Sequence, residues 1–200
     1  KKQEIRKRVW LEMEKKDIAT FPLPCFGRIP NFKGAEVAAL KIRGIDEYKH
    51  ASSVMVGPDS PQAPVRRIAL MDGKLLVMPT PRLKSGYLII RPERVKGKEK
   101  EASTIRGAFK YGELTNVPPT LDLIIEGSVA VDLDGYRLGK GKGFGDREIF
   151  SAEGIAKKSI IVITTVHDMQ IVDFVPREEH DKRVDIIITP NKIIRIHPKT

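Results

Sequence analysis

Residues 53–78 read SVMVGPDSPQAPVRRIALMDGKLLVM. Short apolar runs stand at both ends, at 53–56 and 75–78, and residues 62–71 between them read as a helix. A buried strand, a helix and a second buried strand in succession are typical of a parallel pair whose connecting helix covers one face of the sheet. This stretch therefore predicts an α/β fold.

The same alternation continues on both sides of this unit. We expect helices over residues 2–17, 34–42, 102–112 and 146–157. We expect further strands over 87–90, 121–126 (extended by 129–132), 159–164, 184–189 and 192–196, the last two as a hairpin, with 91–100 as a charged connector. The prediction is one domain over residues 1–200, a three-layer α/β/α arrangement around a mixed, mostly parallel sheet.

Length and composition exclude several protein classes. Two hundred residues suit a single domain, and the one cysteine, Cys25, excludes a disulfide framework and a cysteine-based zinc site. A hydrophobic content of 40% excludes wholesale disorder. No apolar run approaches the ~18 residues of a membrane span. The first ten residues also lack the apolar segment of a secretory signal. We therefore expect a cytoplasmic protein without a membrane partner.

Positive charge is unevenly distributed along the chain. The net charge is +10, but residues 1–100 hold 22 basic and 11 acidic groups, whereas residues 101–200 hold 14 and 15. A basic half-chain indicates an anionic partner, either a nucleic acid or a small phosphorylated ligand. A solvated surface of mixed charge explains the same numbers, so both interpretations stay open.

A glycine-rich stretch, GKGKGFGD at residues 139–146, is the strongest local signal for chemistry. Gly139, Gly141 and Gly143 alternate with Lys140 and Lys142. Glycine lets backbone amides approach an anion closely, and the helix expected to follow presents further unpaired amides at its N-terminus. The lysines add positive charge. This combination favours a polyphosphate ligand, although the spacing matches neither a P-loop nor a dinucleotide-binding loop.

Asp146 stands where this loop meets the expected helix. A carboxylate there is placed to face a Mg²⁺ ion that bridges phosphate groups. The competing interpretation is a glycine-rich hairpin followed by a helix for which Asp146 is only the N-cap.

Three segments in the right order resemble the 5-formyltetrahydrofolate cyclo-ligase family. Residues 136–146, YRLGKGKGFGD, resemble its ATP-binding loop, and residues 2–6, KQEIR, resemble its N-terminal K-x-x-x-R. Residues 175–185, VPREEHDKRVD, followed by Thr189, resemble its C-terminal P-x-E-x-H-D-x-x-V-D stretch, and Gln170 stands where the family often has glutamine.

The resemblance implies a layered α/β fold related to sugar-phosphate isomerases and coenzyme A transferases. It also implies a reaction that uses MgATP. The formyl oxygen of 5-formyltetrahydrofolate is phosphorylated, a neighbouring amine closes the ring, and phosphate leaves to give the 5,10-methenyl form and ADP. Such chemistry needs positioning and charge neutralisation more than covalent catalysis.

The resemblance also implies roles for individual residues. Lys2 and Arg6 would contact the ATP phosphates, with Arg6 and Lys142 contributing to catalysis, and Asp146 and Asp181 would hold Mg²⁺. The residues implied to bind ATP are Lys2, Arg6, Arg137, Leu138, Gly139, Lys140, Gly141, Lys142, Gly143 and Phe144.

The folate side of the implied site is represented by two residues. Phe144 would stack near the pterin, and Glu36 is the candidate carboxylate for its hydrogen bonds. The family usually has a second aromatic residue where this chain has Gly145. The chain therefore looks like a divergent branch, similar to the domain that is fused to RNA-binding modules in animals.

Two further functions remain as alternatives. One is a nucleotide- or RNA-binding regulatory protein that has lost the reaction, although an aromatic content of 6% offers few stacking platforms for bases. The other is a sugar-phosphate or acyl-coenzyme A enzyme of the same fold, for which no catalytic signature is present. We expect a monomer or a homodimer.

The amide content generates a stability prediction. Asparagine and glutamine number three each, while 31% of residues are charged, a pattern found in thermophilic proteins. We expect a midpoint of thermal unfolding above the ~45–65 °C of mesophilic domains, measured by calorimetry. A midpoint inside that range would contradict a thermophilic origin.

Overall fold

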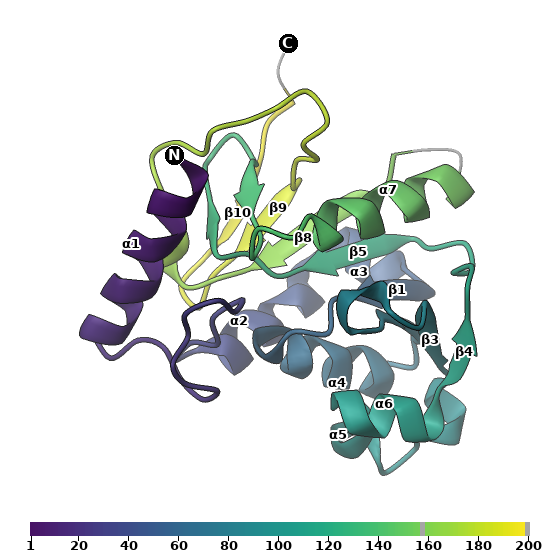
Figure 1. Cartoon of the computed structure of the whole chain (residues 1–200). Helices are drawn as coiled ribbons and strands as arrows, with labels where there is room; N and C mark the ends of the chain where they lie inside the picture. The colour runs from purple at the N-terminus through teal and green to yellow at the C-terminus, as the bar shows by residue number, and fades with distance from the viewer. Residues whose placement is uncertain (157–158, 199–200) are drawn as a thin grey trace.

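The computed structural model describes residues 1–156 and 159–198 (Figure 1). Its centre is an eight-stranded sheet in the order β10-β9-β8-β5-β1-β2-β3-β4, in which β9, β8, β5, β1 and β2 run parallel. The outer strands β10, β3 and β4 are antiparallel to their neighbours, and β10 and β4 form the edges of the sheet. The strands are β1 Ser53–Val56, β2 Leu75–Pro79, β3 Tyr87–Ile90, β4 Glu113–Thr115, β5 Leu123–Glu126, β8 Ile161–Thr165, β9 Ile186–Ile188 and β10 Ile193–Arg195.

Both faces of the central strands are buried, which explains their continuous apolar runs. Successive side chains alternate between the faces: Val54 and Val56 pack in one core and Met55 in the other. In β5, Leu123 and Ile125 share the core of Val54, whereas Ile124 lies on the opposite side.

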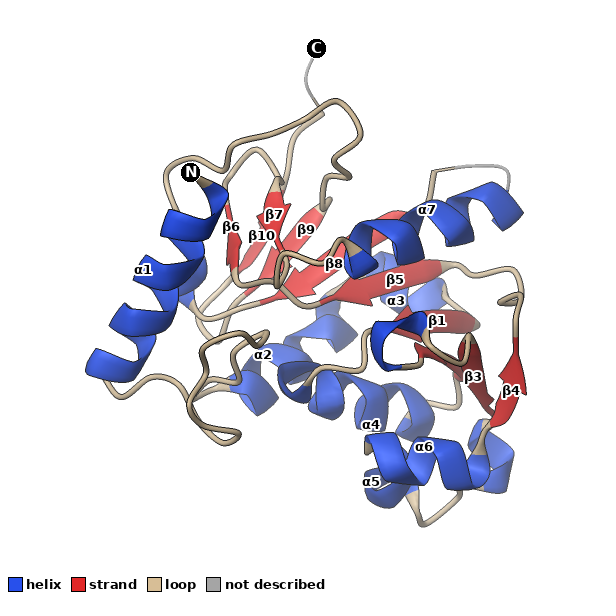
Figure 2. Cartoon of the chain, in the orientation of Figure 1, coloured by secondary structure: helices blue, strands red, loops and turns tan. Residues whose placement is uncertain are grey.

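Helices cover the two faces unequally (Figure 2). The first core contains Trp10 from α1, Ala38 from α2, Ile68 from α4 and Ala108 from α6, while the second contains Ile149 from α7. The arrangement is therefore the three-layer α/β/α architecture that the sequence predicts, around a mixed, mostly parallel sheet. The helices are α1 Lys2–Lys15, α2 Ala35–Leu40, α3 Asp46–His50, α4 Ala63–Met71, α5 Glu99–Ala102, α6 Ile105–Tyr111 and α7 Phe144–Ala156.

Most expected elements form, and the differences have local causes. The short helix α3 and the short edge strand β4 were not predicted. Helix α5 begins in a stretch that was predicted to be only a charged connector. The expected helix 146–157 starts earlier, at Phe144, and residue 157 lies outside the described residues.

The predicted extension of β5 through residues 129–132 is wrong. Residues Ala130–Val131 instead form β6, which pairs with β7 (Arg137–Leu138) in a separate two-stranded sheet. The backbone carbonyl groups just beyond β5 are occupied by side chains: the Gln170 amide donates to those of Ser128 and Val129. The resulting hairpin turns through Gly135 (φ +91°) and directs residue 137 toward the end of β5.

None of the helices in the described part of the chain combines the length and apolarity that a membrane span requires.

Arg66 of α4 ties the segment after β1 to the helical layer. Its side chain is 2% exposed and donates to the backbone carbonyl groups of Gly57, Asp59 and Ser103. Burial lowers the pKa of Arg66 to about 10, but the guanidinium stays charged at neutral pH. This residue thereby fixes the loop that follows β1, which borders the cleft described below.

Replacing Arg66 should therefore destabilise the fold. Arg66→Met removes the donor from three backbone carbonyl groups, and we expect a loss of about 3 kcal/mol in the free energy of unfolding, measured by urea denaturation. Arg106→Met, at an exposed position of α6, should change it by less than about 0.5 kcal/mol. A loss below about 1 kcal/mol for Arg66→Met would show that these contacts are dispensable.

Candidate active site

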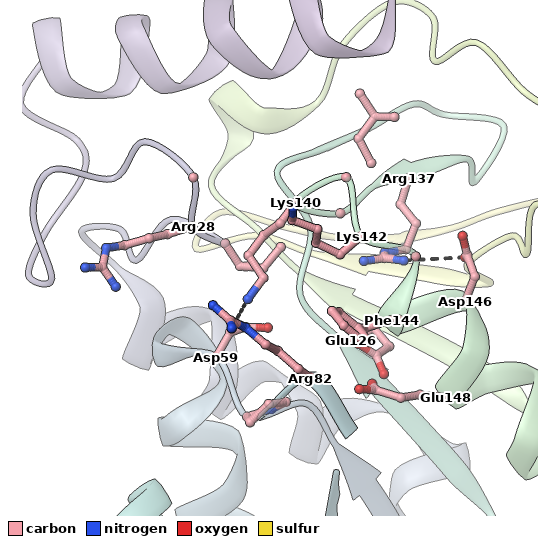
Figure 3. Close-up of a pocket in the computed structure, with 18 of the residues that line it drawn as sticks. Arg28, Asp59, Arg82, Glu126, Arg137, Lys140, Lys142, Phe144, Asp146 and Glu148 are labelled. Carbon is pink, nitrogen blue, oxygen red and sulfur yellow. Dashed lines mark hydrogen bonds and ion pairs between the residues drawn. The ribbon is translucent and has the colours of Figure 1, made fainter. Parts of the chain in front are cut away.

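A cleft of about 630 Å³ opens at the carboxyl edge of the parallel strands (Figure 3). Its walls come from α1, from the segment after β1, from the loop between β7 and α7, and from the first turns of α7. Ligands of open α/β sheets commonly bind at this edge. All twelve residues that sequence analysis assigned to ATP, Mg²⁺ and catalysis line this one cleft: Lys2, Arg6, Arg137, Leu138, Gly139, Lys140, Gly141, Lys142, Gly143, Phe144, Asp146 and Asp181.

Two glycines of the loop are required by its backbone conformation. Gly141 and Gly143 adopt left-handed backbone conformations, with φ of +101° and +72°, which other residues adopt only with strain. A Cβ atom on Gly141 would also lie 3.5 Å from the guanidinium carbon of Arg6. The loop and α1 are therefore closely fitted to each other.

Two arginines stand beside the loop, one bonded to it and one anchored at the end of β5. The Nε atom of Arg6 donates to the carbonyl oxygen of Gly139 at 2.7 Å, and a terminal guanidinium nitrogen of Arg137 donates to that of Gly127, also at 2.7 Å. Burial, and next the positive charge of Arg137, lowers the pKa of Arg6. An anion bound between the two guanidinium groups would relieve this repulsion, so the charge arrangement favours a phosphate-bearing ligand.

Arg137 also explains why residue 145 is glycine. A Cβ atom at Gly145 would lie 2.8 Å from a terminal nitrogen of the Arg137 guanidinium. That guanidinium is 5% exposed and is held by hydrogen bonds to Gly127 and Ser128 and by an ion pair with Asp146 at 3.6 Å. A second aromatic side chain at this position would have to displace Arg137.

The lysines at the rim differ in their partners. Lys2 forms an ion pair with Asp181 at 3.2 Å, and Lys140 forms one with Asp59 at 3.4 Å. Lys142 lines the cleft and is exposed. Of the two lysines in the loop, only Lys140 forms an ion pair in the described part of the chain. Lys142 can therefore reach an incoming ligand without breaking an ion pair.

Candidate metal ligands stand in two places along the cleft. Asp146 lies in the first turn of α7, and because the helix begins at Phe144 it is not the N-cap. Asp181 belongs to a group with Glu178 and His180, whose ligand atoms lie within 4.8 Å of one another. Carboxylate oxygens suit Mg²⁺, which commonly takes one or two of them together with phosphate oxygens. Asp146 and Asp181 fit that requirement because both face the space where phosphates would lie.

The two residues assigned to the pterin are placed differently. Phe144 lines the cleft, and the guanidinium of Arg147 lies 5.0 Å from its ring centroid. Glu36 is 71% exposed, 3.9 Å from Arg67, and it borders a second, shallower pocket that meets the main cleft at Ser60. The structure thus brings Phe144, and not Glu36, to the main cleft.

Sequence reasoning missed the most buried charges of this cleft. Glu126 ends β5 and Glu148 lies in α7, and the two carboxyl groups point toward one another (Figure 3). They are 3% and 4% exposed. Burial raises the pKa of both, and that of Glu148 is raised further by the charge of Glu126 and by its hydrogen bond to Glu126. A charged residue that ends an otherwise apolar strand at the carboxyl edge is a signal that could have identified Glu126.

Comparison with known proteins identifies the family of the chain. The sequence profile of the 5-formyltetrahydrofolate cyclo-ligase family matches residues 1–190. A methenyltetrahydrofolate synthase domain-containing protein of Homo sapiens is 38% identical over 203 residues, which cover 96% of this chain and 53% of that protein. The protein of the same description from Danio rerio is 41% identical over 212 residues, covering 99% of this chain and 55% of that protein.

A solved structure shares the fold. The 5,10-methenyltetrahydrofolate synthetase of Aquifex aeolicus superposes with a TM-score of 0.61 at 20% identity, covering 100% of this chain and 94% of that one. The chain spans about half the length of the curated relatives that it matches. Because the family profile covers nearly the whole sequence, the protein belongs to the 5-formyltetrahydrofolate cyclo-ligase family.

Proposed function

We propose that this chain converts 5-formyltetrahydrofolate, or a related formylated reduced pterin, to the 5,10-methenyl form with consumption of ATP in the presence of Mg²⁺. The observation that carries the proposal is the pair Arg6 and Arg137. Arg6 donates to the glycine loop, Arg137 is anchored to the end of β5, and burial followed by the charge of Arg137 lowers the pKa of Arg6. Two neighbouring cations, of which Arg137 is also paired with Asp146, suit a polyphosphate.

The proposed role of the loop is to position the phosphates. The formyl oxygen attacks the terminal phosphorus, ADP leaves, a neighbouring amine closes the ring on the formyl carbon, and phosphate departs. Lys142 and Arg6 would neutralise charge on the phosphoryl group during its transfer, and loop amides would hold its oxygens. The remaining requirement is to keep the formyl group near this phosphate, a matter of geometry in the cleft.

Two carboxylates would complete the site. Asp146 and Asp181 would hold Mg²⁺, which would supply charge neutralisation at the phosphates when bound. In the structure Asp146 forms an ion pair with Arg137, and Asp181 forms one with Lys2. Phosphate binding would draw these two cations toward the nucleotide and leave the carboxylates to the metal ion. Phe144 would stack against the pterin, and Glu36 remains a prediction for its hydrogen bonds.

The reaction itself gives the first test. Purified protein mixed with 5-formyltetrahydrofolate and MgATP should show an ATP-dependent rise in methenyl absorbance, because ring closure forms that chromophore. Omitting ATP or chelating Mg²⁺ should abolish the rise. Nucleotide binding without any rise would contradict the cyclo-ligase proposal and favour the alternative of a nucleotide-binding protein that lacks this reaction.

A lysine substitution tests the loop assignment. Lys142→Ala removes an exposed cation from the cleft, and we expect an increase of about tenfold in the dissociation constant for ATP, measured by calorimetry. Lys96→Ala, an exposed lysine outside the cleft, is the matched control and should bind as the unsubstituted protein does. Equal affinities for the two variants would remove Lys142 from the nucleotide site.

A further inference from the structure

The floor of the cleft is acidic, although its rim is basic. At the floor, Glu126 and Glu148 approach each other from β5 and α7 and line the cleft. One carboxylate oxygen of each, Oε1 of Glu126 and Oε2 of Glu148, is buried and has no hydrogen-bond partner among the described residues. A buried acceptor without a donor costs about 1–3 kcal/mol, so these two oxygens require donors.

The neighbouring arginine does not meet this requirement. The hydrogen bonds of Arg137 go to Gly127 and Ser128, and its ion pair goes to Asp146. Its charge acts on the glutamate pair only at longer range. Arg137 therefore does not supply the donors for the two free acceptor oxygens, and a molecule that enters the cleft is their candidate source.

The separation of charge constrains the shape of that molecule. Lys2, Arg6, Lys140 and Lys142 line the same cleft as the glutamate pair. A nucleotide alone would complement the cations but place negative charge above two buried carboxyl groups. A ligand set with anionic phosphates at the rim and an N–H-rich group at the floor would complement both regions.

We propose that Glu126 and Glu148 bind a heterocycle edge with two adjacent N–H donors, namely the 2-amino and ring N–H groups of the pterin. This inference rests on the proposed function, since it assigns the floor of the cleft to the pterin head and the rim to ATP. It adds to the sequence-based expectation for Glu36, which lies outside the main cleft. Two neighbouring carboxylate oxygens match two parallel N–H donors, a geometry that also rejects ligands lacking one of them.

The test uses two probes that differ by one donor. Binding of pterin and of 4-oxopteridine, which lacks the 2-amino group, is measured by calorimetry on the unsubstituted protein and on Glu126→Gln and Glu148→Gln. We expect the unsubstituted protein to prefer pterin by tenfold or more and each variant to lose most of this preference. ATP affinity, which reports the rim, should change less than twofold, and this shows that the variants are folded.

A matched control and several contrary outcomes complete the test. Glu93→Gln, an exposed carboxylate outside the cleft, should keep the full preference for pterin. Equal binding of the two probes to the unsubstituted protein, no pterin binding, or a preference that survives in both variants would overturn the inference. Loss of Mg²⁺ binding in the variants with the pterin preference intact would also overturn it, because the pair would then be a metal site. Pterin binding with the expected preference but no conversion of 5-formyltetrahydrofolate would contradict the proposed function alone.

Discussion

The cleft depends on the anchoring of Arg137 to the end of β5. Its bonds to Gly127 and Ser128 hold a guanidinium at the carboxyl edge of the sheet, where it faces Asp146 on one side and repels Arg6 on the other. That position favours glycine at residue 145, because a Cβ atom there would lie 2.8 Å from a guanidinium nitrogen and Arg137 would have to shift. The replacement of a family aromatic by glycine is therefore coupled to the path of this arginine.

Much of the fold was predictable because its central strands are buried on both faces. Continuous apolar runs identified β1 and β3 to the residue, and the helix between β1 and β2 followed from its flanking strands. The failures fall on short elements, such as α3 and β4, and on segments whose hydrogen bonds come from side chains, neither of which has a long periodic pattern. Residues 129–132 illustrate this, since Gln170, 41 and 42 positions away, takes the carbonyl groups that would have extended β5.

The residues of the site also divide into those that were predictable from the sequence and those that were not. The glycines and lysines of the loop were predictable because local spacing brings them together, whereas Lys2 and Arg6, one helical turn apart, were assigned through the family resemblance. The acidic floor of the site was not predictable, because Glu126 and Glu148 lie in elements that meet only in the folded chain. Net charge was a poor guide to the location of the site. Most of the basic residues among residues 1–100 lie outside the cleft, while Lys140 and Lys142 belong to a half-chain with a net charge of −1.

The central claim is that residues 139–146 with Arg6 and Arg137 bind the phosphates of a nucleotide. Hydrogen exchange of the backbone amides of 139–146, followed by mass spectrometry with and without MgATP, tests this most directly, since bound phosphates would occupy those amides. The account predicts that saturating MgATP slows exchange in this segment several-fold and leaves the distant hairpin of β9 and β10 unchanged. Unchanged exchange in 139–146 under conditions in which ATP is demonstrably bound would contradict it.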